Sequence, residues 1–139
     1  MDGILNVNKP IGCTSFDVVR KIRQITGEKK VGHAGTLDPD ASGVLLVCLG
    51  KATRVVEYLS ELPKSYLAVI RFGIETDTED SSGKVIKIAE CSSLTESDVE
   101  NVLHAFVGDI TQIPPMVSAV HHQGQRLYKL ARAGIQVSR

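Results

Sequence analysis

Hydrophobic and polar positions divide the first half of the chain into two strands, two helices and a glycine-rich loop. The apolar pattern predicts a strand over residues 3–8, ended by Lys9-Pro10, and a second strand over 44–49 that is buried on both faces. Between them, Thr14 or Ser15 begins a helix that Gly27 ends. Its predicted apolar face holds Phe16, Val19, Ile22 and Ile25 or Thr26. After Gly50 we expect a helix over 52–62 with an apolar face of Val55, Tyr58, Leu59 and Leu62.

The second half of the chain predicts further strands and helices. Residues 65–72 alternate with period 2, so we expect a strand that pairs antiparallel with 84–89 across the acidic turn 76–83. Thr95 begins a helix over 96–106, closed by Gly108, with inward-facing Val99, Val102, Leu103 and Phe106. An extended stretch through Pro114-Pro115, a turn at Gly124 and a basic segment over 127–133 follow. Because no regular βαβ alternation is present, we expect an α+β fold with a mixed, mostly antiparallel sheet flanked by helices.

Composition is that of an ordinary globular domain, with 139 residues of which 42% are hydrophobic and 23% charged. No apolar run approaches the roughly 20 residues that span a bilayer, and no signal peptide is apparent, so we expect a cytoplasmic protein without a membrane segment. Cys13, Cys48 and Cys91 form no CxxC pair, which argues against a disulfide framework and a zinc site. We therefore expect reduced thiols, with Cys48 in the core, and no metal.

Charge is unevenly distributed although the formal net charge is zero. Residues 1–37 carry six bases against three acids, whereas residues 74–100 carry eight acids against two bases. The last 24 residues hold Arg126, Lys129, Arg132 and Arg139 and no acid. Such asymmetry is compatible with a polyanion on one face, although a solvated basic face explains it equally well.

The loop over residues 32–43, GHAGTLDPDASG, concentrates the candidate chemistry. Its glycines, Gly32, Gly35 and Gly43, permit turns with positive φ and close approach of a ligand. Asp38 precedes Pro39 and reads either as a turn residue bonded to its own backbone or as a nucleophile or general base. Asp40 is its rival two residues on, and spacing alone does not choose between them.

Two further side chains have both a structural and a functional interpretation. His33 is either a hydrogen-bonded structural residue or part of a site, and no second His or Cys lies at a metal-ligand spacing. Tyr66, one of six aromatic residues, is either half-buried core at a sheet edge or a platform that stacks on a base. The glycine spacing of the loop resembles a phosphate-binding loop only weakly.

Four ordered segments resemble the TruB family of tRNA pseudouridine synthases, most closely the bacterial enzymes. They are GILNVNKPIGCTSFDVVRKI, GHAGTLDPDASGVLLVCLGKATR, KSYLAVIRFGIETDTEDSSG and QIPPMVSAVHHQGQRLYKLARAGIQV. The resemblance implies isomerisation of uridine to pseudouridine at position 55 in the TΨC loop of tRNA, by base flipping and an essential aspartate. It implies the T-arm stem-loop of tRNA as partner, and no cofactor, metal or obligate protein partner.

The resemblance also implies a role for each candidate residue. Asp38 would be the catalytic aspartate, with His33 near the displaced nucleotide and Tyr66 stacked on the uracil. Lys9, Pro10, Gly32 and Gly35 would support the catalytic loop. Residues 116–139 would be a basic insertion that grips RNA, with Arg126, Lys129 and Arg132 on the phosphate backbone.

Two departures from the family pattern qualify this expectation. His121 stands where the family usually has lysine, which would weaken RNA binding above neutral pH. The family also has a later motif whose arginine pairs with the catalytic aspartate, more sheet and a small RNA-binding domain, none of which lies in these 139 residues. The expected fold is therefore the N-terminal part of the catalytic domain, incomplete at its C-terminus. The alternative is an inactive truncated fragment that folds or binds RNA only.

Overall fold

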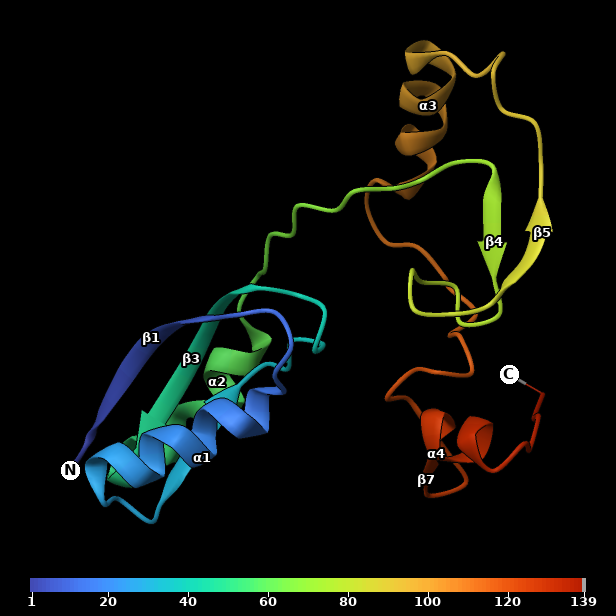
Figure 1. The fold of residues 1–139 in the computed structure, drawn as a ribbon. Helices are drawn as coiled ribbons and strands as arrows, with labels where there is room; N and C mark the ends of the chain where they lie inside the picture. Colours follow the sequence, from blue (N-terminus) through green and yellow to red (C-terminus); the bar gives the residue numbers. More distant parts are fainter. Residues whose placement is uncertain (139) are drawn as a thin grey trace. The chain divides into compact units, whose positions relative to one another are not determined.

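The computed structural model describes residues 1–138, which divide into two compact units, residues 1–67 and residues 68–138 (Figure 1). The first unit contains a three-stranded sheet of β1 (Gly3–Lys9), β2 (Val31–Ala34) and β3 (Gly43–Leu49), in the order β1-β3-β2. Both pairings are antiparallel, which confirms the mostly antiparallel sheet. The register places Lys9 opposite Gly43 and His33 opposite Val47.

Helix α1 (Ser15–Thr26) begins and ends where its sequence predicts. Thr14 is the N-cap, and its hydroxyl accepts a hydrogen bond from the Asp17 amide while the Asp17 carboxylate accepts one from the Thr14 amide. The Thr14 hydroxyl also donates to the Asp17 carboxylate, and this bond together with the bond from the Thr14 amide holds the pKa of Asp17 below its usual value. Gly27 closes the helix with φ +68°, a conformation that glycine adopts without strain.

The core of the first unit lies between α1 and the sheet. Val18 and Val19 of α1 pack against Val31 of β2 and against three alternate residues of β3, which are Leu45, Val47 and Leu49. The opposite face of β3 carries Cys48, which is fully buried, and burial raises the pKa of its thiol. A 3₁₀ turn (Gly50–Val55) and α2 (Val56–Glu61) follow β3, and α2 contacts β2. The central strand is thus covered on both faces, as predicted, although Val44 at its start is exposed.

The second unit consists of short elements joined by turns. A two-stranded ribbon of β4 (Ile74–Thr76) and β5 (Val85–Ile88) precedes α3 (Glu96–Leu103), which Thr95 caps as predicted, and a 3₁₀ turn over His104–Phe106. A hairpin of β6 (His121–His122) and β7 (Gln125–Arg126) then leads into α4 (Leu127–Arg132). Among the described residues of this unit, Leu127 alone is a buried hydrophobic side chain.

Several predictions about single elements are wrong. Residues 65–72 form no strand and are exposed, and β5 pairs with β4 instead. The alternation in 65–72 specifies which side chains share a face, but a strand also needs a neighbour for its backbone. The predicted helix over 52–62 is a 3₁₀ turn followed by a short α-helix. The predicted apolar faces also fail in part, since Phe16, Ile25, Val102 and Phe106 are exposed.

The packing of β3 makes a stability prediction. Leu45→Ala removes a side chain that is 1% exposed, so we expect it to lower the free energy of unfolding of the first unit by about 2–5 kcal/mol. Val44→Ala on the same strand truncates a side chain that is 65% exposed and should cost under about 0.5 kcal/mol. Hydrogen exchange of the β3 amides measures both values, and equal costs would contradict this core.

Candidate active site

Asp38 lies in an exposed loop between β2 and β3, close to the start of α1. Its backbone carbonyl accepts a hydrogen bond from the Ala41 amide at 3.0 Å, which makes a turn. Its carboxylate accepts no hydrogen bond and forms no ion pair with any residue in 1–138. Asp38 is thus a turn residue through its backbone carbonyl, whereas its carboxylate takes no part in the turn and faces solvent.

Lys9 is the buried cation beneath this loop. It ends β1 with a side chain that is 0% exposed, and its Nζ donates to the carbonyls of Pro10 at 2.9 Å and Cys13 at 2.8 Å. A longer contact of 3.5 Å joins the same Nζ to the carbonyl of Pro39, next to Asp38. An ammonium group removed from water needs such acceptors, because leaving it unbonded costs several kcal/mol. Lys9 therefore holds the 10–13 turn and reaches the Asp38 loop.

The backbone on both sides of Asp38 is bonded to the segment that leads into α1. On one side, the Ser15 hydroxyl accepts from the Leu37 amide at 2.9 Å and donates to the Leu37 carbonyl at 3.1 Å. On the other, the Gly12 amide donates to the Pro39 carbonyl at 2.8 Å. Gly12 has φ +88°, so its backbone conformation suits glycine.

His33 lies on β2 rather than in a loop, which corrects the prediction that residues 32–43 are all loop. Its Nδ1 lies 2.6 Å from the Gly35 carbonyl, and because a carbonyl only accepts, Nδ1 carries the hydrogen. Nε2 of the neutral ring is then an acceptor. Gly32 is likewise on β2 and lacks the positive φ predicted for it, whereas Gly35 (φ +85°) and Gly43 (φ +138°) have it.

Tyr66 lies in the first unit on the exposed segment that follows α2. Its side chain is 71% exposed, so the interpretation as half-buried core at a sheet edge is wrong. The nearby Lys64 Nζ is bonded to the carbonyls of Ser60 and Leu62. A Cβ added at Gly35 would lie 3.5 Å from Lys64 Cε, so the glycine loop and the start of this segment are neighbours.

The basic residues of 116–138 lie on the β6–β7 hairpin and α4. Arg126 is on β7, whereas Lys129 and Arg132 are on α4, and all three are exposed. The Arg132 guanidinium lies 5.4 Å from the ring centroid of Tyr128. His121, also exposed, is opposite Arg126 across the ribbon.

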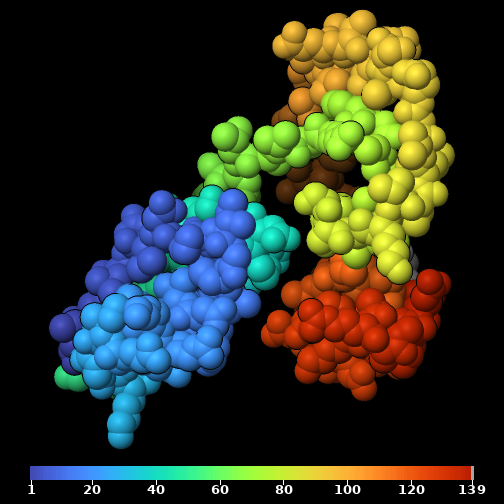
Figure 2. All heavy atoms as spheres, in the orientation of Figure 1, coloured from blue at the N-terminus to red at the C-terminus, as the bar shows by residue number. Residues whose placement is uncertain are grey.

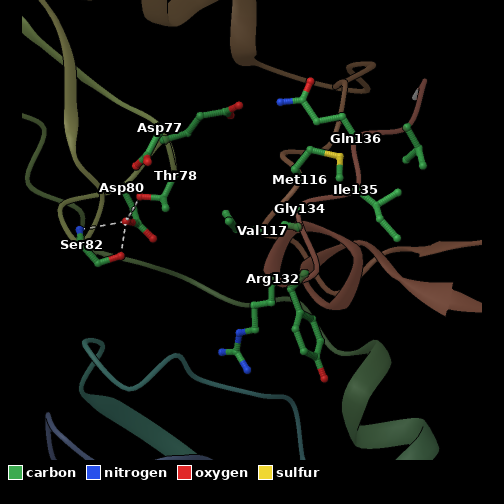
Figure 3. Close-up of a pocket in the computed structure, with 14 residues that line it drawn as sticks. Asp77, Thr78, Asp80, Ser82, Met116, Val117, Arg132, Gly134, Ile135 and Gln136 are labelled. Atoms are coloured by element: carbon green, nitrogen blue, oxygen red, sulfur yellow. Dashed lines mark hydrogen bonds between the residues drawn. The ribbon is translucent and has the colours of Figure 1, made fainter.

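A hollow of about 690 Å³ separates α4 from the acidic turn of the second unit (Figure 3). Asp77, Asp80 and Arg132 line it, together with apolar side chains such as Ile135, and the two segments are adjacent in Figure 2. Asp80 is committed to its own turn, because its Oδ1 accepts from the Ser82 and Thr78 hydroxyls, each at 2.6 Å, and from the Ser82 amide at 2.8 Å. These bonds hold the pKa of Asp80 below its usual value. The Asp80 carboxylate at the hollow therefore serves to stabilise its own turn.

Ser15 lies in the first of the segments that resemble the family, but sequence reasoning gave it no role in the site. It was a candidate for the helix cap, a role that the structure gives to Thr14. Its bonds span 22 positions of sequence, and no local pattern reports a contact of that separation. Burial is the signal that finds it, because Lys9 and Ser15 are the buried polar residues within the described chain.

Residues 1–138 contain neither a candidate metal site nor a candidate membrane-spanning helix. No cluster of three or more His, Cys, Asp or Glu side chains in this part of the chain could hold a metal ion. None of its helices combines the length and apolarity needed to cross a membrane. The site is a solvent-exposed carboxylate on an anchored loop.

Comparison with known proteins agrees with the sequence motifs. The family model described as "TruB family pseudouridylate synthase (N terminal domain)" matches residues 23–139. The chain belongs to the TruB family. Proteins called tRNA pseudouridine synthase B from Dehalococcoides mccartyi and Clostridium perfringens are 57% and 50% identical to it over its whole length.

The matches to these TruB relatives cover the whole of this chain but only part of each relative. The chain spans 46% of the first relative and 47% of the second, so it corresponds to slightly less than half of their length. A chain in the crystal structure of a Cbf5–Nop10–Gar1 complex is 32% identical and matches with a TM-score of 0.57, over 86% of this chain and 31% of that one. The chain therefore shares its mixed fold of helices and antiparallel strands with that structure.

The buried lysine of this TruB chain makes a testable prediction. Lys9→Met keeps most of the side-chain volume but removes every donor, so we expect it to lower the free energy of unfolding of the first unit by about 1–3 kcal/mol. The Gly12 amide, which is bonded to Pro39, should also exchange faster. The control is Lys21→Met, since Lys21 is an exposed residue of α1. Equal stability and equal Gly12 exchange in the two variants would show that Lys9 does not anchor the loop.

Proposed function

We propose that this chain carries the catalytic aspartate of a tRNA pseudouridine synthase that isomerises uridine 55 in the TΨC loop. The observation that supports this most is the setting of Asp38. Its carboxylate is exposed and unbonded among the described residues, whereas the backbone at Leu37 and Pro39 on its two sides is fixed by hydrogen bonds. A reactive group needs this combination, because catalysis depends on a prepositioned side chain that is free to meet the substrate. The reaction that we propose is the one named for the family. Because the proposed substrate is tRNA, we also propose that the protein acts in the cytoplasm.

The reaction rearranges bonds within one nucleotide. The N1–C1′ glycosidic bond breaks, the uracil turns, a C5–C1′ bond forms, and C5 loses its proton to water while N1 gains one. Asp38 would act by attack on the sugar, by attack on the base or by taking a proton from C2′. None of these routes needs a cofactor or a metal.

The base must leave its stack before a carboxylate reaches it, at a cost of a few kcal/mol. The exposed ring of Tyr66 is available to stack on the displaced uracil and offset part of that cost. His33 would contribute through Nε2, because Nδ1 is committed to the Gly35 carbonyl. Lys9, Pro10, Gly32 and Gly35 would support the loop from below and from the side.

The basic hairpin and helix would bind the phosphates of the T-arm stem-loop. Residues 116–138 contain no acid, so Arg126 and Lys129 can offer their charge without local neutralisation. Arg132 would add charge from the end of α4, beside the hollow. These contacts would set affinity and orientation rather than sequence preference.

Replacing the catalytic carboxylate tests the proposal. Asp38→Asn keeps the shape of the side chain but removes its negative charge, so we expect tritium release from a T-arm stem-loop labelled at C5 of its uridines to fall below detection. RNA affinity should stay within about twofold, because the variant removes no phosphate contact. The matched control is Asp40→Asn two residues away, which should retain tritium release.

Three outcomes would contradict this assignment. Tritium release that persists in Asp38→Asn would show that another group is the catalyst. Loss in Asp40→Asn alone would transfer the role to Asp40. An unaltered chain that binds the stem-loop and releases no tritium would show an RNA-binding fragment in place of an enzyme.

The phosphate contacts make a prediction about salt. Lys129→Gln removes one exposed charge from α4, so we expect weaker binding of the stem-loop at every salt concentration and a logarithmic salt slope that is smaller by about 1. Fluorescence anisotropy over a salt series measures both effects. Lys51→Gln, an exposed charge in the first unit, is the control, and an equal change in both variants would mean that α4 has no special place in RNA binding.

A further inference from the structure

The buried polar side chains of the described residues converge on one loop. Lys9 is 0% exposed and Ser15 is 2% exposed, and both donate hydrogen bonds toward the segment that carries Asp38. Burying a polar group is unfavourable unless its bonds are satisfied, so two buried polar residues that are both bonded to the same loop indicate a constraint there. Lys9 belongs to the support already described, whereas Ser15 has no assigned role.

The two bonds of Ser15 fix a single residue from both sides. Its Oγ accepts from the amide of Leu37 and donates to the carbonyl of the same residue, at 2.9 Å and 3.1 Å. That carbonyl belongs to the peptide group that joins Leu37 to Asp38. A fixed Leu37 therefore sets the orientation of the peptide plane from which Asp38 begins.

Ser15 is itself held rigidly. It is the first residue of α1, and Val18 and Val19 in the next turn are in the core of the first unit. Its hydroxyl is not used for capping, because Thr14 fills that role with the Asp17 amide. The Ser15 hydroxyl is thus free to act as a connector between the core and the loop.

We propose that Ser15 is a positioning residue that aligns Asp38 by fixing the backbone of Leu37. The inference rests on the proposed function in that Asp38 is taken as the catalyst. Ser15 does not touch the substrate. It acts together with Gly12, which holds Pro39, so that the residues on the two sides of Asp38 are attached to the first residue of α1 and to the turn before it.

The first measurement is independent of activity. Ser15→Ala removes both bonds, and alanine is a favourable residue at a helix position, so α1 should persist. We expect the Leu37 amide, whose partner is the Ser15 hydroxyl, to exchange roughly tenfold faster, with α1 amides unchanged. Thr14→Ala is the matched control, because it removes the cap next door and should speed exchange in the first turn of α1 but not at Leu37.

The second measurement separates catalysis from binding. With the T-arm stem-loop, Ser15→Ala should lower kcat by roughly 10- to 100-fold and leave the dissociation constant of the RNA within about twofold. Thr14→Ala should leave kcat within about twofold. If Ser15→Ala does not fold, Ser15→Cys keeps the shape with a weak donor and is expected to show the same changes.

Each outcome decides between the proposals. Unchanged Leu37 exchange in Ser15→Ala, or equal losses of kcat in Ser15→Ala and Thr14→Ala, overturns the positioning role. Faster Leu37 exchange with a selective loss of kcat supports it. Absence of tritium release in the unaltered chain overturns the proposed function instead, and the Leu37 exchange rate then decides alone whether Ser15 holds the loop.

Discussion

The site depends on one buried ammonium group. Lys9 is fully removed from solvent, and its Nζ is surrounded by backbone carbonyls of Pro10, Cys13 and, at a longer distance, Pro39. Such a cation tolerates burial only where acceptors converge, so the turn after β1 and the loop before β3 have to meet around it. The antiparallel register supports this meeting, because Lys9 at the end of β1 lies opposite Gly43 at the start of β3.

Neutral acceptors around Lys9 have a consequence for Asp38. An aspartate or glutamate partner would satisfy the ammonium equally well but would place a further negative charge near the candidate catalyst, and like charges repel one another. Carbonyl dipoles anchor the loop without that effect. In the proposed site, anchoring by the buried Lys9 and Ser15 is therefore separate from the proposed reactive group, which is the exposed carboxylate of Asp38.

How much the sequence could predict follows from how local each feature is. Thr14 and Gly27 bound α1, and the apolar runs gave β1 and β3, because caps and periodicity act within a few residues. Strand β2 was missed because glycine and histidine interrupt its four residues, and residues 65–72 were misassigned because alternation cannot supply a pairing partner. Motif resemblance named Asp38, but the contact from Ser15 to Leu37 lies outside both kinds of signal.

The two units differ in what stabilises them, and this difference matches the division of labour that we propose. The first unit has a buried core between α1 and the sheet, whereas the second is held mainly by local bonds such as those of Asp80 and the cap at Thr95. Segments that bury few apolar side chains open at low free energy. A catalyst has to be prepositioned, but a surface that contacts phosphates through long basic side chains can adjust to the RNA at a modest cost in ordering. The unit that carries Asp38, for which we propose a need for exact positioning, is therefore the unit with the buried core.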